Sequence, residues 1–133
     1  MLIPTELFAT IMGNISATSA RESAAAAMRI WHTMFRKFSP LLGPMSADLL
    51  FARSLAEQEV AFAWLPHIAP EAASTAFAAF ERSLEHRTAE EIVAANRAML
   101  STYTTILAEL IGMRLATSFL GAAFAHENTN KNS

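Results

Sequence analysis

Four histidines are the side chains in this sequence best suited to metal, haem or phosphotransfer chemistry: His32, His67, His86 and His126. No glutamate stands three residues before any of them, and no two are four residues apart, so the spacings that build metal sites on helices are absent. The chain also contains no cysteine, which excludes thiolate ligands, thiol nucleophiles and disulfides. We therefore expect neither a metal site nor a bound cofactor.

His32 is the one histidine with cationic neighbours suited to phosphotransfer. It lies in the segment IWHTMFRKF, with Arg36 one helical turn further on and Lys37 beside that arginine. An exposed imidazole with cations nearby could carry a phosphoryl group. The alternative is a surface histidine that flanks an apolar helix stripe. His32 is therefore a candidate phosphoacceptor, and the weaker of the functional hypotheses.

Two arginines follow apolar residues on predicted helices. Arg53 has Leu49 and Leu50 as helical neighbours and Glu57 one turn away, which predicts a partly buried guanidinium. It either pairs with Glu57 within the helix or anchors a carboxylate, a phosphate or a second copy of the chain. Arg114 is the analogous residue later in the chain, and it could also donate to the last carbonyls of the preceding helix.

Paired carboxylates occur at Glu57 and Glu59 and again at Glu90 and Glu91. Residues one or two positions apart on a helix point in different directions, so neither pair can share general acid and base work. The sequence also lacks a nucleophile elbow, a Ser-x-x-Lys motif and a glycine-rich phosphate loop. We therefore expect no catalytic residue of ordinary hydrolytic or redox chemistry.

The overall composition predicts one helical domain and excludes several partners. Of the 133 residues, 53% are hydrophobic, and alanine clusters such as SAAAAM favour helix. A net charge of −2 gives no attraction to nucleic acid, and no apolar run approaches the roughly 20 residues that a membrane span requires. The N-terminus has no basic region, unlike a signal peptide. We expect a soluble, cytoplasmic protein.

Apolar residues recur at steps of three and four along most of the chain, the spacing of amphipathic helices. The stripe from Trp31 through Phe35 to Phe38 is the clearest. Pro40 disfavours helical geometry at Ser39, so we expect that helix to end there. The expected helices cover residues 4–12, 19–39, 46–63, 71–86, 88–111 and 113–125.

Capping residues and glycines mark the ends of these helices. The sequence TAEE has the form of a capping box between Thr88 and Glu91. Gly13 is expected to end the first helix in a left-handed conformation. Gly112 is expected to mark a bend or break after the helix 88–111. The first helix is too short to be stable alone and must pack on its own domain or on a neighbouring subunit.

The segment FSPLLGPMSADLLFARSL, residues 38–55, is echoed by LAELIGMRLATSFLGAAF, residues 107–124. Gly112 follows Gly43 by 69 residues. Both copies predict a helix, a glycine turn and a second helix that folds back. Two readings stay open: a true internal duplication, or two amphipathic hairpins that are merely alike. The other matched pairs are Trp31 with Leu100, Phe38 with Leu107, Leu41 with Leu110, Leu42 with Ile111, Ala47 with Ala116, Leu50 with Phe119 and Phe51 with Leu120.

These features predict an all-α fold: a single-domain helical bundle of about five helices, with two helix–Gly–helix hairpins bridged by a middle helix. Residues 1–18 are expected to form a short N-terminal helical arm and residues 19–125 the bundle domain. Residues 126–133, HENTNKNS, are expected to form a disordered polar tail.

The chain is rich in large apolar side chains, with nine phenylalanines, seven methionines and two tryptophans, while only 17% of its residues are charged. Exposed apolar surface usually marks a partner, most often a second copy. We expect a non-catalytic interaction or regulatory module that forms a homodimer or binds another protein. The alternative is a sensor of a small apolar or amphipathic ligand in the bundle core, near Trp31, Trp64 and Tyr103. The full set of candidate contact residues is Phe8, Met12, Trp31, Phe51, Arg53, Trp64, Tyr103 and Arg114.

Overall fold

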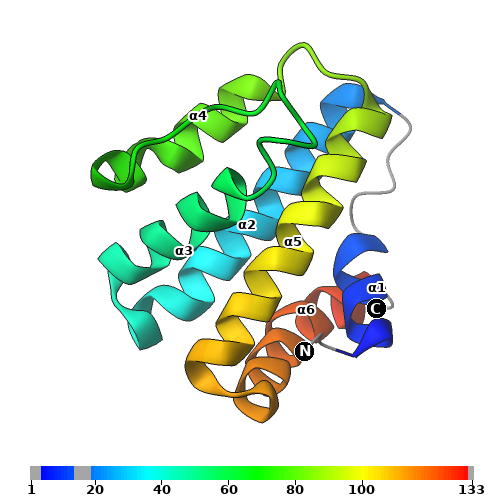
Figure 1. Ribbon diagram of the computed structural model, residues 1–133. Coiled ribbons are helices and arrows are strands. Elements are labelled where there is room, and N and C mark those ends of the chain that lie inside the picture. Colours follow the sequence, from blue (N-terminus) through cyan, green and yellow to red (C-terminus); the bar gives the residue numbers. More distant parts are fainter. Residues whose placement is uncertain (1–3, 14–18, 132–133) are drawn as a thin grey trace.

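The computed structural model describes residues 4–13 and 19–131, and every regular element in those ranges is a helix (Figure 1). This confirms the predicted all-α class. Residues 1–3, 14–18 and 132–133 lie outside the described residues, as do the parts of the predicted arm and tail that fall on them. The elements are α1 (Thr5–Met12), α2 (Ala20–Leu42), α3 (Pro44–Ala56), the 3-10 helix η2 (Pro70–Thr75), α4 (Ala76–Ser83), α5 (Ala89–Ile111) and α6 (Met113–Lys131).

Two glycines end the two long helices in the same way. Gly43 follows α2 with φ 91° and ψ 147°, and Gly112 follows α5 with φ 92° and ψ 146°. Residues with side chains rarely adopt these angles. Each glycine N–H donates to the carbonyl four residues earlier at 2.8 Å, and each glycine carbonyl accepts from the amide four residues later, of Ala47 or Ala116, at 3.0 Å. One residue therefore suffices to turn each long helix into the next one.

The N-terminal caps of the two long helices also correspond. The Ser19 hydroxyl accepts from the Glu22 amide at 3.1 Å, and the Thr88 hydroxyl accepts from the Glu91 amide at 3.1 Å. Glu91 accepts in return from the Thr88 amide at 3.0 Å, which confirms the predicted capping box. Ser19 and Glu22 precede Thr88 and Glu91 by the same 69 residues that separate the glycines, and α2 and α5 each contain 23 residues.

Burial repeats with this spacing from the first helix to the last. Ile11 of α1 and Phe80 of α4 are fully buried, and Phe8 and Phe77, one turn before them, are both half-buried. Because these residues are also 69 positions apart, α1 corresponds to α4. The chain therefore consists of two similar halves of three helices each, α1–α3 and α4–α6. Further buried pairs at this spacing are Phe38 with Leu107, Ala47 with Ala116, and Leu55 with Phe124.

The helices pack with two-fold character. α2 and α5 lie side by side and run in the same direction (Figure 1). α2 packs on α3 of its own half and on α6, while α5 packs on α6 of its own half and on α3. The short first helix of each half packs on the third helix of the other half. Thus α1 packs on α6, and α4 packs on α3. Exchanging the halves returns the same set of contacts among these six α-helices, as a two-fold axis would.

The predicted end of α2 and the predicted conformation at the end of α1 were wrong. α2 continues through Pro40 to Leu42, because a proline in the last turn removes one backbone hydrogen bond near the helix end, while the following glycine supplies the stop. Gly13 has a φ of −57°, so α1 ends in a right-handed and not a left-handed conformation.

Other boundaries differ in the hairpins and the middle helix. α3 begins at Pro44, whose fixed φ suits a first helical turn, and ends at Ala56 and not at residue 63. The predicted helix 71–86 is divided into η2 and α4 by Ala72, which has φ −105° and ψ 19°. Both pieces pack on α3, so this middle element covers the first hairpin. α6 continues to Lys131, beyond the predicted end at residue 125.

The capping box at the start of α5 predicts a specific pH dependence. Hydrogen bonds from Thr88 and the nearby charge of Arg87 lower the pKa of Glu91 below its ordinary value. A lowered folded-state pKa stabilises the protein above the unfolded-state pKa, and this contribution disappears as the pH falls through the folded-state value. We expect Glu91→Gln to be less stable than wild type in urea unfolding at neutral pH, and the difference to shrink at pH 3. An unchanged difference at both pH values would contradict the charged cap.

Candidate functional site

An aromatic cluster fills the core between α2, α3, α4 and α5. The Trp31 ring meets the Phe51 and Tyr103 rings edge on, with 5.2 Å between centroids in each pair. Phe51 also contacts Phe77 and Phe80 of α4, at 5.4 and 5.7 Å. The structure therefore brings together three predicted site residues, Trp31, Phe51 and Tyr103, and it buries all three.

A buried hydrogen bond crosses from α2 to α5 beside this cluster. Nε1–H of Trp31 donates to Oδ1 of Asn96 at 2.6 Å, while Nδ2 of Asn96 is buried without a partner in the described part of the chain. Burial raises the pKa of Tyr103, because a phenolate would lose its hydration there. The cluster is therefore a neutral core that fixes how the two long helices meet.

The void beside the cluster is too small for a ligand. It is lined in part by Trp31, Phe51 and Tyr103 and has a volume of about 10 Å³. That space holds at most one water molecule. A ligand in the bundle core would therefore have to open the packing between the two long helices.

Trp64 lies apart from the cluster, in the connector between α3 and η2. Its ring contacts the Phe62 ring, with 6.3 Å between centroids, and the Arg87 guanidinium lies 5.2 Å over it. Nη1 of Arg87 is also 3.7 Å from Oε2 of Glu91. Trp64 therefore attaches the connector to the start of α5 through a cation–π contact, which is a structural role.

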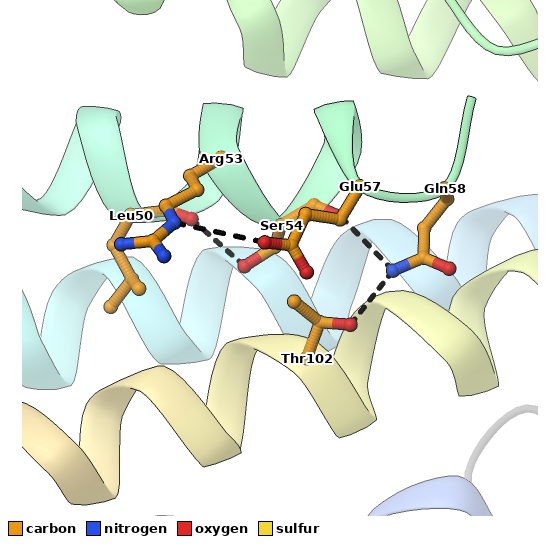
Figure 2. A network of polar contacts seen from close by, with 6 residues as sticks. All are labelled: Leu50, Arg53, Ser54, Glu57, Gln58 and Thr102. Atoms are coloured by element: carbon orange, nitrogen blue, oxygen red, sulfur yellow. Dashed lines mark hydrogen bonds and ion pairs between the residues drawn. The ribbon is translucent and has the colours of Figure 1, made fainter. Parts of the chain in front are cut away.

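Arg53 is exposed, so the prediction of partial burial was wrong. Its Nε lies 3.8 Å from Oε1 of Glu57, one helical turn away (Figure 2). An exposed pair of this kind contributes at most a few tenths of a kcal/mol. Beside it, Nε2 of Gln58 donates to Oγ1 of Thr102 at 2.8 Å and to the Ser54 carbonyl at 3.3 Å (Figure 2). These bonds tie the end of α3 to α5, and no ligand anchor is formed.

The remaining predicted contact residues lie at separate places. Met12 of α1 is buried in the core, and Phe8 is half-buried at the edge of a groove between α1 and α5. Arg114 is exposed at the start of α6, and in the described residues it donates no hydrogen bond to the last carbonyls of α5. The structure therefore does not assemble the predicted residues into one site.

His32 is exposed on α2, with its ring centroid 4.8 Å from that of Phe77. Asp48 lines the same hollow, and burial raises the pKa of its carboxyl. The predicted cationic support is weak, because Lys37 lies 5.0 Å over the ring of Phe119. A carboxylate beside His32 would repel a phosphoryl group. Phosphotransfer at His32 stays a prediction.

Five exposed apolar side chains lie within six residues of Gly43 or Gly112 along the sequence and form what we call the apolar end: Leu41, Met45, Leu49, Leu110 and Leu115. Because α2 and α5 run in the same direction, both turns lie at one end of the bundle (Figure 1). Met45 is 78% exposed and Leu110 is 60% exposed. The sequence identified Leu110 only as the match of Leu41, and this surface was not predicted. The sequence did contain a signal for this surface: Leu41 and Leu110 are matched residues, and each stands two positions before a turn glycine.

No metal site or membrane span is found in the described ranges. Within residues 4–13, 19–69 and 71–124, no three histidine or acidic side chains lie close enough to share a metal ion. Within residues 4–13 and 19–131, no helix combines the length and the apolar character needed to cross a bilayer.

No family model, curated protein or solved structure matches the chain.

Proposed function

We propose that this chain is a non-catalytic interaction module that pairs with a second copy through its apolar end. The observation that carries the proposal is the clustering of exposed large apolar residues. In the described residues, all of them except Val60 belong to the apolar end. Fully burying an exposed leucine or methionine side chain contributes about 1.5–3 kcal/mol. These five side chains are 41–78% exposed, so burying the exposed part of each contributes a share of that energy and favours association.

A second copy is the partner that this surface fits best. The apolar end is built from two related turns, with Leu41 and Leu110 at equivalent positions of the two halves. A patch with internal two-fold character can meet the same patch of another copy in an isologous dimer. Charges at its edge are compatible, because Glu109 and Arg114 are both exposed and can pair across such an interface.

Charged substitutions at the apolar end test the proposal. We expect wild type to sediment as a dimer, and Leu41→Glu/Leu110→Glu to weaken dimerisation by about two orders of magnitude or more, since two buried leucines become buried carboxylates. Both positions are exposed in one subunit, so the monomer should keep its helix content and melting temperature. Analytical ultracentrifugation over a concentration series measures the change.

The matched control is Val60→Glu. Val60 is fully exposed in the connector after α3, outside the apolar end. A carboxylate there should leave the dimer intact. A monomeric wild type, or a double variant that dimerises as well as Val60→Glu, would overturn the proposal.

A further inference from the structure

We infer that the groove between α1 and α5 binds a small amphipathic carboxylate, a site separate from the apolar end. This groove, which we call the arm groove, has a volume of about 430 Å³ and lies within the usual range of small-molecule sites. Its lining includes Phe8 from α1 and Ala94, Arg97, Ala98, Ser101 and Thr104 from α5.

The equivalent groove, between α2 and α4, is partly filled by side chains, and we call it the filled groove. Phe77 of α4 and His32 and Phe35 of α2 line a hollow of about 260 Å³. Subtracting 69 from 77 gives Phe8, and adding 69 to 32 and 35 gives Ser101 and Thr104. The two grooves are therefore the same position in the two halves, and they differ in what fills them.

The arm groove is larger because two rings are replaced by small side chains. In the filled groove, the His32 ring packs against Phe77 at 4.8 Å and Phe35 occupies the space beside it. In the arm groove, Ser101 and Thr104 leave the Phe8 side uncovered. The Thr104 hydroxyl donates to the Leu100 carbonyl of its own helix at 2.8 Å, so it needs no hydrogen-bond acceptor in the groove. An apolar ligand body fits where the two rings are missing.

The positive charge of Arg97 indicates which chemical group the ligand carries at its polar end. Arg97 lines the arm groove and is exposed, and in the described residues it forms no ion pair or hydrogen bond. A guanidinium at the edge of an apolar groove suits a carboxylate, which it can bind through two parallel hydrogen bonds. The filled groove instead contains Asp48, which would repel an anion. The ligand is therefore expected in the arm groove and not in its equivalent.

Titration calorimetry with two probes tests the inference. Decanoate presents an alkyl body and 2-naphthoate an aromatic one, each with one carboxylate. We expect at least one of them to bind wild type at one site per chain. Decanoate alone would indicate an alkyl ligand, and 2-naphthoate alone would indicate an aromatic ligand. Decanol, which lacks the charge, should bind at least roughly tenfold more weakly than decanoate.

Three variants place the ligand. Arg97→Gln should weaken carboxylate binding by roughly tenfold or more, while Arg29→Gln, an exposed arginine on α2, should not change it. Ser101→His/Thr104→Phe installs the side chains of the filled groove and should abolish binding. If that variant fails to fold, Ala94→Phe fills the groove from an exposed position and serves the same purpose.

Two results would overturn the inference: neither carboxylate binds wild type, or binding persists unchanged in both Arg97→Gln and the groove-filling variant. The outcome is independent of the proposed dimer. Leu41→Glu/Leu110→Glu leaves the arm groove intact and should bind the carboxylate as wild type does.

Discussion

Replacing Trp31 with alanine is expected to lower the free energy of unfolding by about 3–5 kcal/mol, a large share of the roughly 5–15 kcal/mol that keeps a domain folded. Trp31 is fully buried and joins α2 to α3 and α5 through its contacts with Phe51, Tyr103 and Asn96. Its removal leaves a cavity between α2, α3 and α5 and a buried amide with no partner. Urea unfolding followed by far-ultraviolet circular dichroism measures the loss.

A double-mutant cycle separates packing from the hydrogen bond. Trp31→Phe keeps an aromatic ring but removes the donor, so both polar groups of Asn96 become unpaired in the core. Asn96→Ala introduces the residue that occupies the equivalent position, Ala27. We expect Trp31→Phe to cost less in the Asn96→Ala background than in wild type. Trp64→Ala, at a half-buried connector position, is the control and should cost less than Trp31→Ala. A loss of under about 1 kcal/mol for Trp31→Ala would contradict the packing described for this core.

The second large effect is expected at the glycine turns. Gly43→Ala and Gly112→Ala should each lower the free energy of unfolding by about 1–3 kcal/mol. A β-carbon at either position would have open space around it, so the cost comes from the backbone, which an alanine must hold at a φ near 91° or 92°. The loss should appear in urea unfolding of each variant, and the double variant should lose roughly the sum, since the turns lie in different hairpins.

Two other glycines are matched controls for this experiment. Gly13 has a right-handed helical φ and Gly121 lies inside α6, and both have open space where a β-carbon would be. Gly13→Ala and Gly121→Ala should therefore be neutral or stabilise by up to about 1 kcal/mol. Equal effects at all four glycines would show that the backbone angles of the turns are not the cause.

Local sequence signals predicted the helical class and several helix ends. Thr88 with Glu91 and the two turn glycines act within a few residues, so their roles could be read without knowledge of the fold. The echo between the two hairpins was also visible. The extension of this repeat to the helix caps at Ser19 and Thr88 was not recognised, because neither cap lies within the echoed segments.

Predictions that depended on tertiary packing were less successful. Arg53 has apolar helical neighbours, yet its own face of α3 is turned outward, and sequence spacing alone cannot show which face a bundle covers. Trp64 was expected beside Trp31, but the connector carries it to Arg87 instead. The exposure of Leu41 and Leu110 depends on where the bundle ends, which no local pattern reveals.

The exchange of short helices between the halves has a topological consequence. α1 packs on α6, and α4 packs on α3. In a three-helix half on its own, the first helix would therefore have no helix to pack on, and the third helix would be left uncovered. Two separate copies of one half could satisfy each other by trading those helices. The chain can therefore be described as a domain-swapped dimer whose two subunits are joined into one polypeptide by the connector between α3 and η2.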